Sequence, residues 1–325
     1  MNVGSNLGYT DLGGGNNTVC VGGNSTFIHT TNGNDDVTVA SNMIAANLGS
    51  GDDSLIVHNN LGYANLGDGN NILAVGENLG RADLGNGNNQ AYVAGNAGTF
   101  IAMNGDDCVS VKGDLIEANL HSGNNNLGVC GDLEYASFGN NNDALYVGGT
   151  LGRVELGNGD NLAVVKGDAS IIRSMAGDDN VYVDNNVIAA NLGRGNDLLE
   201  VGGNMASANM GHGNDKAVVL GELGRIEAGY GDDRVAAGQI NGVIKLDAGD
   251  DILVLEDISS RSSAYGGSGF DELILIGNAS DYDVHSTRHG IEITDSQGDT
   301  MSANGFESID FINEAFNYDV FDYIA

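Results

Sequence analysis

A glycine recurs every 18 residues along most of this chain. The series starts at Gly15 and runs to Gly249 without an insertion, with Asn141 in place of one member. Two Asn or Asp residues follow each glycine, as in Gly51-Asp52-Asp53. Loops of ordinary globular domains vary in length, whereas repeats that stack on one another keep a constant length. The constant interval therefore predicts a solenoid.

Each 18-residue unit contains two short extended segments and two turns. In the unit 48–65, the pattern predicts strands over 54–57 and 61–65, a first turn over 48–53 and a second turn over 58–60. Stacked coils of this kind pair in parallel about 4.8 Å apart. The predicted fold class is all-β: a right-handed parallel β-roll or β-solenoid of about 14 coils, with a β-rich C-terminal cap.

Columns of equivalent residues indicate the core, because a residue that faces inward in one coil must do so in every coil. Valine occupies one position of every unit from Val3 to Val219, and the position two residues earlier is equally apolar. These two columns predict one wall of the core. Leucines and alanines of the second strand, such as Leu61, predict the opposite wall. Tyr92 and Arg81 lie at variable positions and are expected to face water.

The second turn carries a polar column instead of a glycine. Side-chain amides at such positions can bond to the coils above and below. We therefore predict an asparagine ladder at Asn24, Asn42, Asn60, Asn78, Asn96, Asp114, Asp132, Asp168, Asn186 and Asn204.

Composition restricts the partners. With 12 basic and 45 acidic residues, the chain carries a formal charge of −33 at pH 7. Such a charge makes nucleic acid and anionic lipid improbable partners and makes a bound cation the natural counter-charge. No apolar run approaches the roughly 20 residues that span a bilayer, and Met1–Ser5 lacks the regions of a secretory signal peptide. We expect neither nucleic-acid binding nor membrane insertion.

The first turn has the chemistry of a calcium site. Calcium prefers six to eight oxygens at about 2.3 to 2.6 Å, from carboxylates and backbone carbonyls. Glycines allow the tight turns that aim carbonyl oxygens, and stacked acidic turns would repel one another without a cation. The pattern resembles the Gly-Gly-x-Gly-x-Asp-x-hydrophobic-x repeat of the RTX (hemolysin-type calcium-binding) family, a parallel β-roll with calcium between adjacent turns. The resemblance covers residues 1 to about 277.

The resemblance implies a set of metal ligands along one edge of the solenoid. Asn replaces Asp at 17, 71, 89, 125 and 161, which lowers the local charge, so we expect metal density to be strongest between residues 177 and 251 and weakest between 69 and 89. The expected calcium-binding residues are Asp35, Asp52, Asp53, Asp107, Asp143, Asp178, Asp179, Asp197, Asp215, Asp232, Asp233, Asp250, Asp251 and Asp271, with Gly51, Gly177, Gly195, Gly213, Gly231 and Gly249.

The end of the chain departs from the period. Gly266–Leu273 lies two residues out of phase and leads into further β-like segments, so we expect a β-roll over 1–265 and a last turn, capping segment and secretion signal over 266–325. This part is similar to the cap and uncleaved C-terminal signal of proteins exported by type I secretion, the signal being Asp319–Ala325. The resemblance implies a secreted or cell-surface protein.

No catalytic motif stands out, neither His-Glu-x-x-His nor Gly-x-Ser-x-Gly, and we expect no enzyme. The function predicted is that of a secreted calcium-binding β-roll with a structural role at the cell surface or in the extracellular matrix. The open edge at Val3–Leu12 suggests head-to-tail self-assembly into filaments or layers. The alternatives are the repeat and secretion module of a larger secreted enzyme, toxin or adhesin, and a polysaccharide-binding surface protein using exposed tyrosines such as Tyr63.

Overall fold

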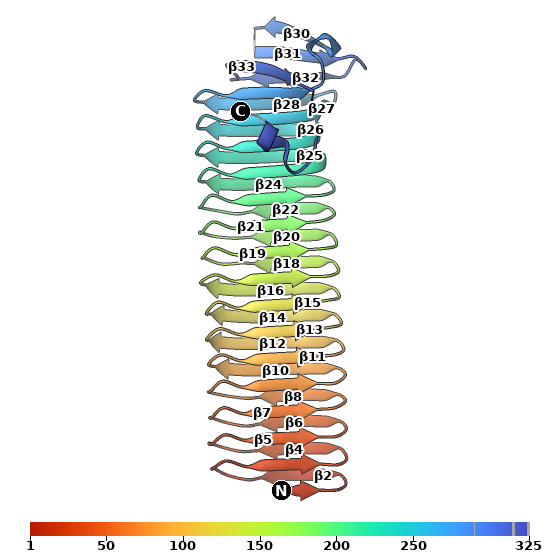
Figure 1. Ribbon diagram of the computed structural model, residues 1–325, viewed down its shortest axis with the longest axis vertical. Coiled ribbons are helices and arrows are strands. Elements are labelled where there is room, and N and C mark those ends of the chain that lie inside the picture. The colour runs from red at the N-terminus through yellow and green to blue at the C-terminus, as the bar shows by residue number, and fades with distance from the viewer. Residues whose placement is uncertain (289, 314–315, 324–325) are drawn as a thin grey trace. The chain divides into compact units, whose positions relative to one another are not determined.

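The computed structural model describes residues 1–288, 290–313 and 316–323 (Figure 1). These residues form β-strands and two short 3-10 helices, with no α-helix among them. They divide into two compact units, Met1–Asn158 and Gly159–Ala325, each of which is a parallel β-solenoid. The all-β solenoid predicted from the glycine interval is confirmed. Within the described residues, no helix is long and apolar enough to cross a membrane.

The first unit consists of short strands, two to a coil. They are β1 (Asn2–Val3), β2 (Leu7–Asp11), β3 (Thr18–Val21), β4 (Ser25–His29), β5 (Asp36–Val39), β6 (Met43–Asn47), β7 (Ser54–Val57), β8 (Leu61–Asn65), β9 (Ile72–Val75), β10 (Leu79–Asn86), β11 (Gln90–Val93), β12 (Ala97–Asn104), β13 (Cys108–Val111), β14 (Leu115–Ser122), β15 (Asn126–Val129), β16 (Leu133–Asn140), β17 (Ala144–Val147) and β18 (Leu151–Glu155).

The second unit continues the same pattern and ends in irregular strands. They are β19 (Leu162–Val165), β20 (Ala169–Arg173), β21 (Asn180–Val183), β22 (Val187–Asn191), β23 (Leu198–Val201), β24 (Met205–His212), β25 (Lys216–Tyr230), β26 (Arg234–Ala248), β27 (Ile252–Asp257), β28 (Ser262–Ser268), β29 (Glu272–Ile276), β30 (Tyr282–Thr287), β31 (Gly290–Asp295), β32 (Thr300–Asn304) and β33 (Ser308–Ile312), with 3-10 helices η1 (Ala279–Asp281) and η2 (Val320–Tyr323).

Most strands pair in parallel with the strands two before and two after them, because two strands make one coil (Figure 1). In β7, for example, Leu55 lies opposite Val37 of β5 and Leu73 of β9. The offset in both pairs is 18 residues, the interval of the glycine series. The strands predicted over 54–57 and 61–65 coincide with β7 and β8.

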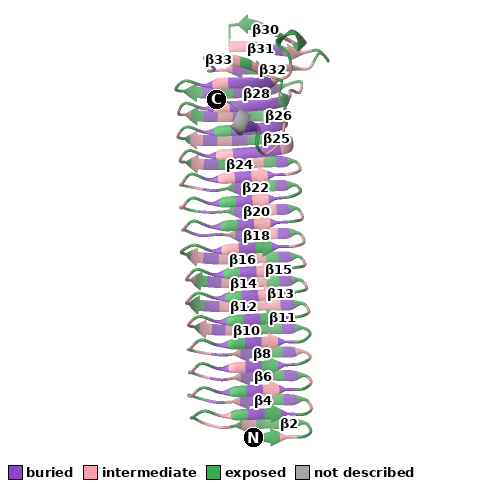
Figure 2. Cartoon of the chain, in the orientation of Figure 1, coloured by how far each residue is buried: buried purple, intermediate pink, exposed green. Residues whose placement is uncertain are grey.

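The core of each unit is a stack of apolar columns inside the coils, which alternate with exposed positions along each strand (Figure 2). Leu55 and Val57 on one strand, and Leu61 and Ala64 on the other, are at most 1% exposed. Both predicted walls are therefore confirmed. A further column, which the sequence analysis did not assign to the core, lies just before the glycine turn and is fully buried at Leu48, Leu66, Leu84, Leu120, Leu156, Leu192 and Leu246. This column closes the edge of the core beneath the acidic turns.

The period breaks where the sequence predicts. Val243 of β26 pairs with Ser263 of β28, an offset of 20 residues, and Arg261 in the lengthened turn has a φ of 74°. Beyond this coil, β30, β31 and β32 form an antiparallel sheet. β32 pairs in parallel with β28, and β33 pairs in parallel with β29. The last regular coil is thus covered by antiparallel strands.

The segment 316–321 returns to the outer face of the second unit. Val320 and Phe321 are buried against Val218, Ala236 and Val254, whose side chains point away from the coil interior. The ammonium of Lys216 lies 5.7 Å from the centre of the Phe321 ring. This segment overlaps the predicted secretion signal at 319–325, of which residues 324 and 325 lie outside the described residues.

Candidate metal centre

The repeated glycine is required by two features of the first turn. Gly195, Gly213 and Gly231 have φ values of 129°, 129° and 120°, a region that side-chain-bearing residues rarely adopt. In addition, a Cβ atom on Gly213 would lie 1.9 Å from the carbonyl oxygen of Gly195 in the preceding coil. The same holds at the other predicted glycines, where a Cβ would lie 2.0 to 2.3 Å from the preceding glycine's oxygen: Gly51, Gly177, Gly195, Gly231 and Gly249. Each glycine carbonyl therefore points along the stack into the space between turns.

We expect the substitution Gly213→Ala to destabilise the second unit by more than about 3 kcal/mol, because it adds a backbone collision to an unfavourable φ. Urea denaturation followed by circular dichroism measures the loss. Gly128→Ala is the matched control, since no atom lies within 4 Å of a Cβ at Gly128. Equal stability of the two variants would contradict this account of the turn.

The Asp or Asn two residues after each glycine points into the solenoid. We refer to these residues, from Asn17 to Asp271, as the inner column. Its members are at most 3% exposed at Asp35, Asp53, Asn71, Asn89, Asp107, Asn125, Asp143, Asn161, Asp179, Asp197, Asp215, Asp233, Asp251 and Asp271. In each unit, Oδ1 of an inner residue accepts a hydrogen bond from the backbone N–H of the inner residue one coil earlier. The N–H of Asp197, for example, donates to Asp215 over 2.8 Å.

The residue just before each inner residue points outward and forms a second ladder of opposite sense. Here the backbone N–H donates to the preceding coil, as when the N–H of Asp250 donates to Oδ1 of Asp232 over 2.9 Å. The sense reverses because consecutive residues of extended backbone direct their N–H groups to opposite neighbours. Asp52, Asp178, Asp232 and Asp250 belong to this exposed outer column. The structure therefore separates the predicted metal ligands into two sets on opposite sides of the turn backbone.

The second turn carries the predicted asparagine ladder. The N–H of Asn60 donates to Oδ1 of Asn42, and the N–H of Asn78 donates to Oδ1 of Asn60. Aspartates take the same role without a change of geometry, since the N–H of Asp132 donates to Oδ1 of Asp114 over 3.0 Å. This column is exposed and its oxygens are used by backbone donors. The prediction of a structural ladder at the second turn is confirmed.

The inner aspartates each bury one oxygen that the fold leaves without a partner. Oδ1 is used in the ladder, but Oδ2 has no hydrogen-bond partner among the described residues at Asp35, Asp53, Asp179, Asp197, Asp215, Asp233, Asp251 and Asp271. Buried polar atoms are almost always paired, and an unpaired buried carboxylate oxygen is costly. A repeated exception of this kind indicates that another group completes the site.

The inner asparagines show what such a group contacts. The Nδ2 atom of Asn71 donates to the carbonyl oxygens of Gly69, at 3.1 Å, and of Leu84, at 3.3 Å. That of Asn125 donates to the carbonyl oxygens of Gly123 and Leu120. Asn17, Asn89 and Asn161 likewise donate to the glycine two residues earlier. The second branch of the inner side chain thus faces backbone carbonyl oxygens.

Where aspartate replaces asparagine, an acceptor takes the place of that donor. Oδ2 of Asp215 has no partner, and no backbone N–H of the described residues donates to the carbonyl oxygen of Gly213. Carboxylate and carbonyl oxygens that face one another without a donor require a proton or a cation between them. The inner column therefore alternates between turns that satisfy themselves and turns that do not.

Burial also controls the ionisation of these carboxyl groups. It raises the pKa of Asp53, Asp107 and Asp215 to about 6, of Asp143 and Asp251 to about 7, and of Asp197 and Asp233 to about 8, from a usual value of 3.8. The neighbouring inner aspartates add a smaller Coulombic contribution at Asp197 and Asp233. Without a counter-charge, the fold favours the neutral carboxyl form.

The chain matches no protein-family model, no curated protein and no solved structure. The resemblance to RTX repeats accordingly depends on the residues of the turn alone. Within the described ranges, no group of three or more His, Cys, Asp or Glu side chains converges as a metal site. Any cation at the inner column must therefore take most of its ligands from backbone carbonyls.

Sequence reasoning missed two features of this site. One is that Asp and Asn of the inner column are buried ladder residues; their position two residues before the apolar Leu55 column, in phase with its inward face, was the available signal. The other is Glu307, whose Oε2 accepts the N–H of Asp271 over 2.8 Å and so completes the ladder at the last coil. No repeat pattern marks Glu307, because it lies outside the period.

Proposed function

We propose that the protein is a calcium-binding β-roll in which calcium ions occupy the aspartate turns of the inner column. The observation that carries the proposal is the buried, unpartnered Oδ2 atom repeated at these aspartates. Carbonyl oxygens contacted by an amide donor in the asparagine turns surround the equivalent place. An all-oxygen, flexible set of ligands is the kind that calcium prefers over transition metals.

The residues that would hold the ion belong to one turn and its neighbour. They are the inner aspartate, through Oδ2, the glycine two residues earlier, through its carbonyl, and the apolar residue five residues earlier, through its carbonyl, as Asp233, Gly231 and Ala228 illustrate. When bound, calcium supplies positive charge that compensates closely spaced buried carboxylates. The outer aspartates would add a favourable long-range field without direct contact, because they lie on the solvent side of the backbone.

The proposal includes an extracellular structural role. Calcium sites built largely from neutral carbonyls and one carboxylate bind weakly, in the range of roughly 10⁻⁴ to 10⁻³ M that is typical of extracellular modules. A rod-like repeat whose folding depends on such an ion would form where calcium is abundant. Secretion through the C-terminal segment and assembly with further copies of the chain are part of this proposal.

Uneven occupancy is the expected result of a crystal structure determined in calcium. Metal density should appear at the aspartate turns between 177 and 251, and should be absent between Asn71 and Asn89, where each Nδ2 already donates to a carbonyl. Anomalous scattering at a long wavelength identifies the ions. Equal occupancy at both places would contradict the role of Oδ2, and density beside the outer aspartates alone would contradict the proposed site.

A further inference from the structure

A longer repeat of 72 residues, four coils, is superimposed on the 18-residue period. Arg81, Arg153 and Arg225 follow one another at this interval, and each pairs with an acid two residues later: Asp83, Glu155 and Glu227. Isoleucine recurs at the same interval at Ile44, Ile116 and Ile188, although these side chains are 65%, 58% and 60% exposed. Core packing does not explain exposed residues, so the four-coil repeat describes the surface.

The first repeat, 25–96, and the third, 169–240, present nearly the same outer surface on their second strands. Equivalent residues lie side by side in two rows across four strands. In the first repeat the rows are Phe27-Ala45-Tyr63-Arg81 and His29-Asn47-Asn65-Asp83. In the third they are Ile171-Ala189-Ser207-Arg225 and Arg173-Asn191-Asn209-Glu227. The largest decrease in side-chain size is from Tyr63 to Ser207.

Tyr63 shows what this surface can hold. Its ring lies half-buried on the sheet, and its hydroxyl donates to Oδ2 of Asp83 over 2.8 Å. Nε of Arg81 donates to the other carboxylate oxygen over 2.9 Å. In the first repeat, a hydroxyl on a six-membered ring is therefore recognised by an arginine-oriented carboxylate. Ser207 provides no such ring in the third repeat.

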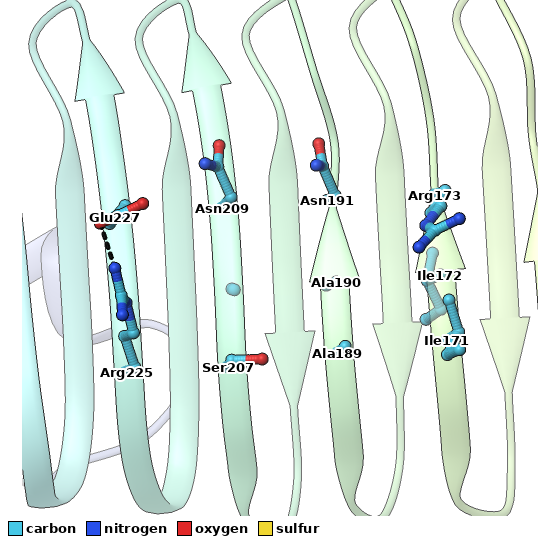
Figure 3. A pocket seen from close by; sticks show the side chains of 11 residues that line it. Ile171, Ile172, Arg173, Ala189, Ala190, Asn191, Ser207, Asn209, Arg225 and Glu227 are labelled. Carbon is cyan, nitrogen blue, oxygen red and sulfur yellow. Dashed lines mark hydrogen bonds and ion pairs between the residues drawn. The ribbon is translucent and has the colours of Figure 1, made fainter.

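The corresponding place in the third repeat is an open groove of about 420 Å³ across β20, β22, β24 and β25. Figure 3 shows Asn191 and Asn209 adjacent to each other, with the Arg225–Glu227 pair at one side and Arg173 at the other. Ala189 and Ser207 lie lower on the same strands. The volume falls within the roughly 300 to 1,000 Å³ of small-ligand sites.

We propose that this groove, which we call the Ser207 groove, binds a pyranose ring of a neutral polysaccharide. A sugar hydroxyl would donate to Glu227, as the Tyr63 hydroxyl donates to Asp83, and further hydroxyls would bond the amides of Asn191 and Asn209. The carbon face of the ring would lie over Ala189 and Ile171. A neutral sugar is favoured over a polyanion because the chain carries a net charge of −33.

The decisive variant is Ser207→Tyr, which gives the third repeat the residue of the first. We expect the tyrosine ring to fill the Ser207 groove and to weaken binding of neutral hexasaccharides, namely maltohexaose, cellohexaose and mannohexaose, by at least about tenfold. Nuclear magnetic resonance titration of each hexasaccharide into folded protein, with the fold verified by circular dichroism, measures the affinity. The inverse variant, Tyr63→Ser, should add a second site in the first repeat and double the stoichiometry.

Ala206→Tyr is the control, because it places a tyrosine on the same strand outside the groove and should leave binding unchanged. If none of the hexasaccharides binds saturably to the folded wild type, or if Ser207→Tyr binds like the wild type, the proposal is overturned. Saturable binding of hexagalacturonate alone would also overturn it, since the ligand would then be a polyanion. None of these outcomes involves the inner column, so the calcium proposal is tested separately.

Discussion

Protein freed of calcium is expected to keep its β-structure at about pH 4 and to lose it as the pH rises from about 6 to 8. The inner aspartates have folded-state pKa values above their unfolded value of 3.8, from about 6 at Asp215 to about 8 at Asp233, because burial disfavours the charged form. A raised folded-state pKa means that the neutral form stabilises the fold. This contribution is fully present below the unfolded pKa and disappears as the pH passes through the folded pKa.

Calcium should reverse this dependence at high pH. The ion competes with protons for the carboxylates, so the stability of the calcium-saturated protein should exceed that of the metal-free protein most strongly at about pH 8. Circular dichroism against pH, after chelation and dialysis and again in millimolar calcium, measures both curves. Full β-structure in the metal-free protein at pH 8 would contradict the prediction, and so would a metal-free protein that is least stable at acidic pH.

The combined variant Asp197→Asn, Asp215→Asn, Asp233→Asn and Asp251→Asn is expected to fold without calcium in the second unit. Each asparagine retains the Oδ1 acceptor of the ladder and adds the Nδ2 donor that Asn71 uses toward Gly69. The variant also removes four buried carboxylates whose ionisation opposes folding. Its thermal midpoint in EDTA at pH 8 should therefore rise to near that of the wild type in calcium, and calcium should no longer shift it.

Alanine at the same four positions provides the contrast. It removes Oδ1 as well and leaves a buried N–H unpaired at each preceding coil, at a cost of about 1 to 3 kcal/mol for each. This variant should unfold with or without calcium. If the asparagine variant unfolds in EDTA as the wild type does, the inner asparagines are not equivalents of the metal-bound aspartates, and the proposed site is wrong.

The solenoid could be predicted in detail because every column repeats the same test. A polar residue in the Leu55 column or a change in the interval would have shown the error in one coil, so strand limits such as those of β7 and β8 follow directly from the sequence. The inner column was harder. Burial of an aspartate contradicts its usual preference for water, and only the ladder geometry shows how Asp215 is held inside.

The remaining features depend on contacts between residues that share no period. The bond from Asp271 to Glu307 joins the repeat to the antiparallel strands, and the packing of Phe321 on Val218 and Val254 joins segments about a hundred residues apart. The Ser207 groove could be found only by comparing surfaces, because the sequence gives no reason to weigh an exposed serine against a tyrosine 144 residues earlier.

The ladders act as a length standard for the chain. Two ladders at the first turn bind each coil to both of its neighbours, so an extra residue there would exchange a buried aspartate for an exposed one. The second turn has a single ladder, which ends where the N–H of Glu222 donates to Asn204. The two-residue lengthening between Asp257 and Ser263 falls in that turn, beyond the end of its ladder. Insertions are thus tolerated where no side chain measures the distance to the next coil.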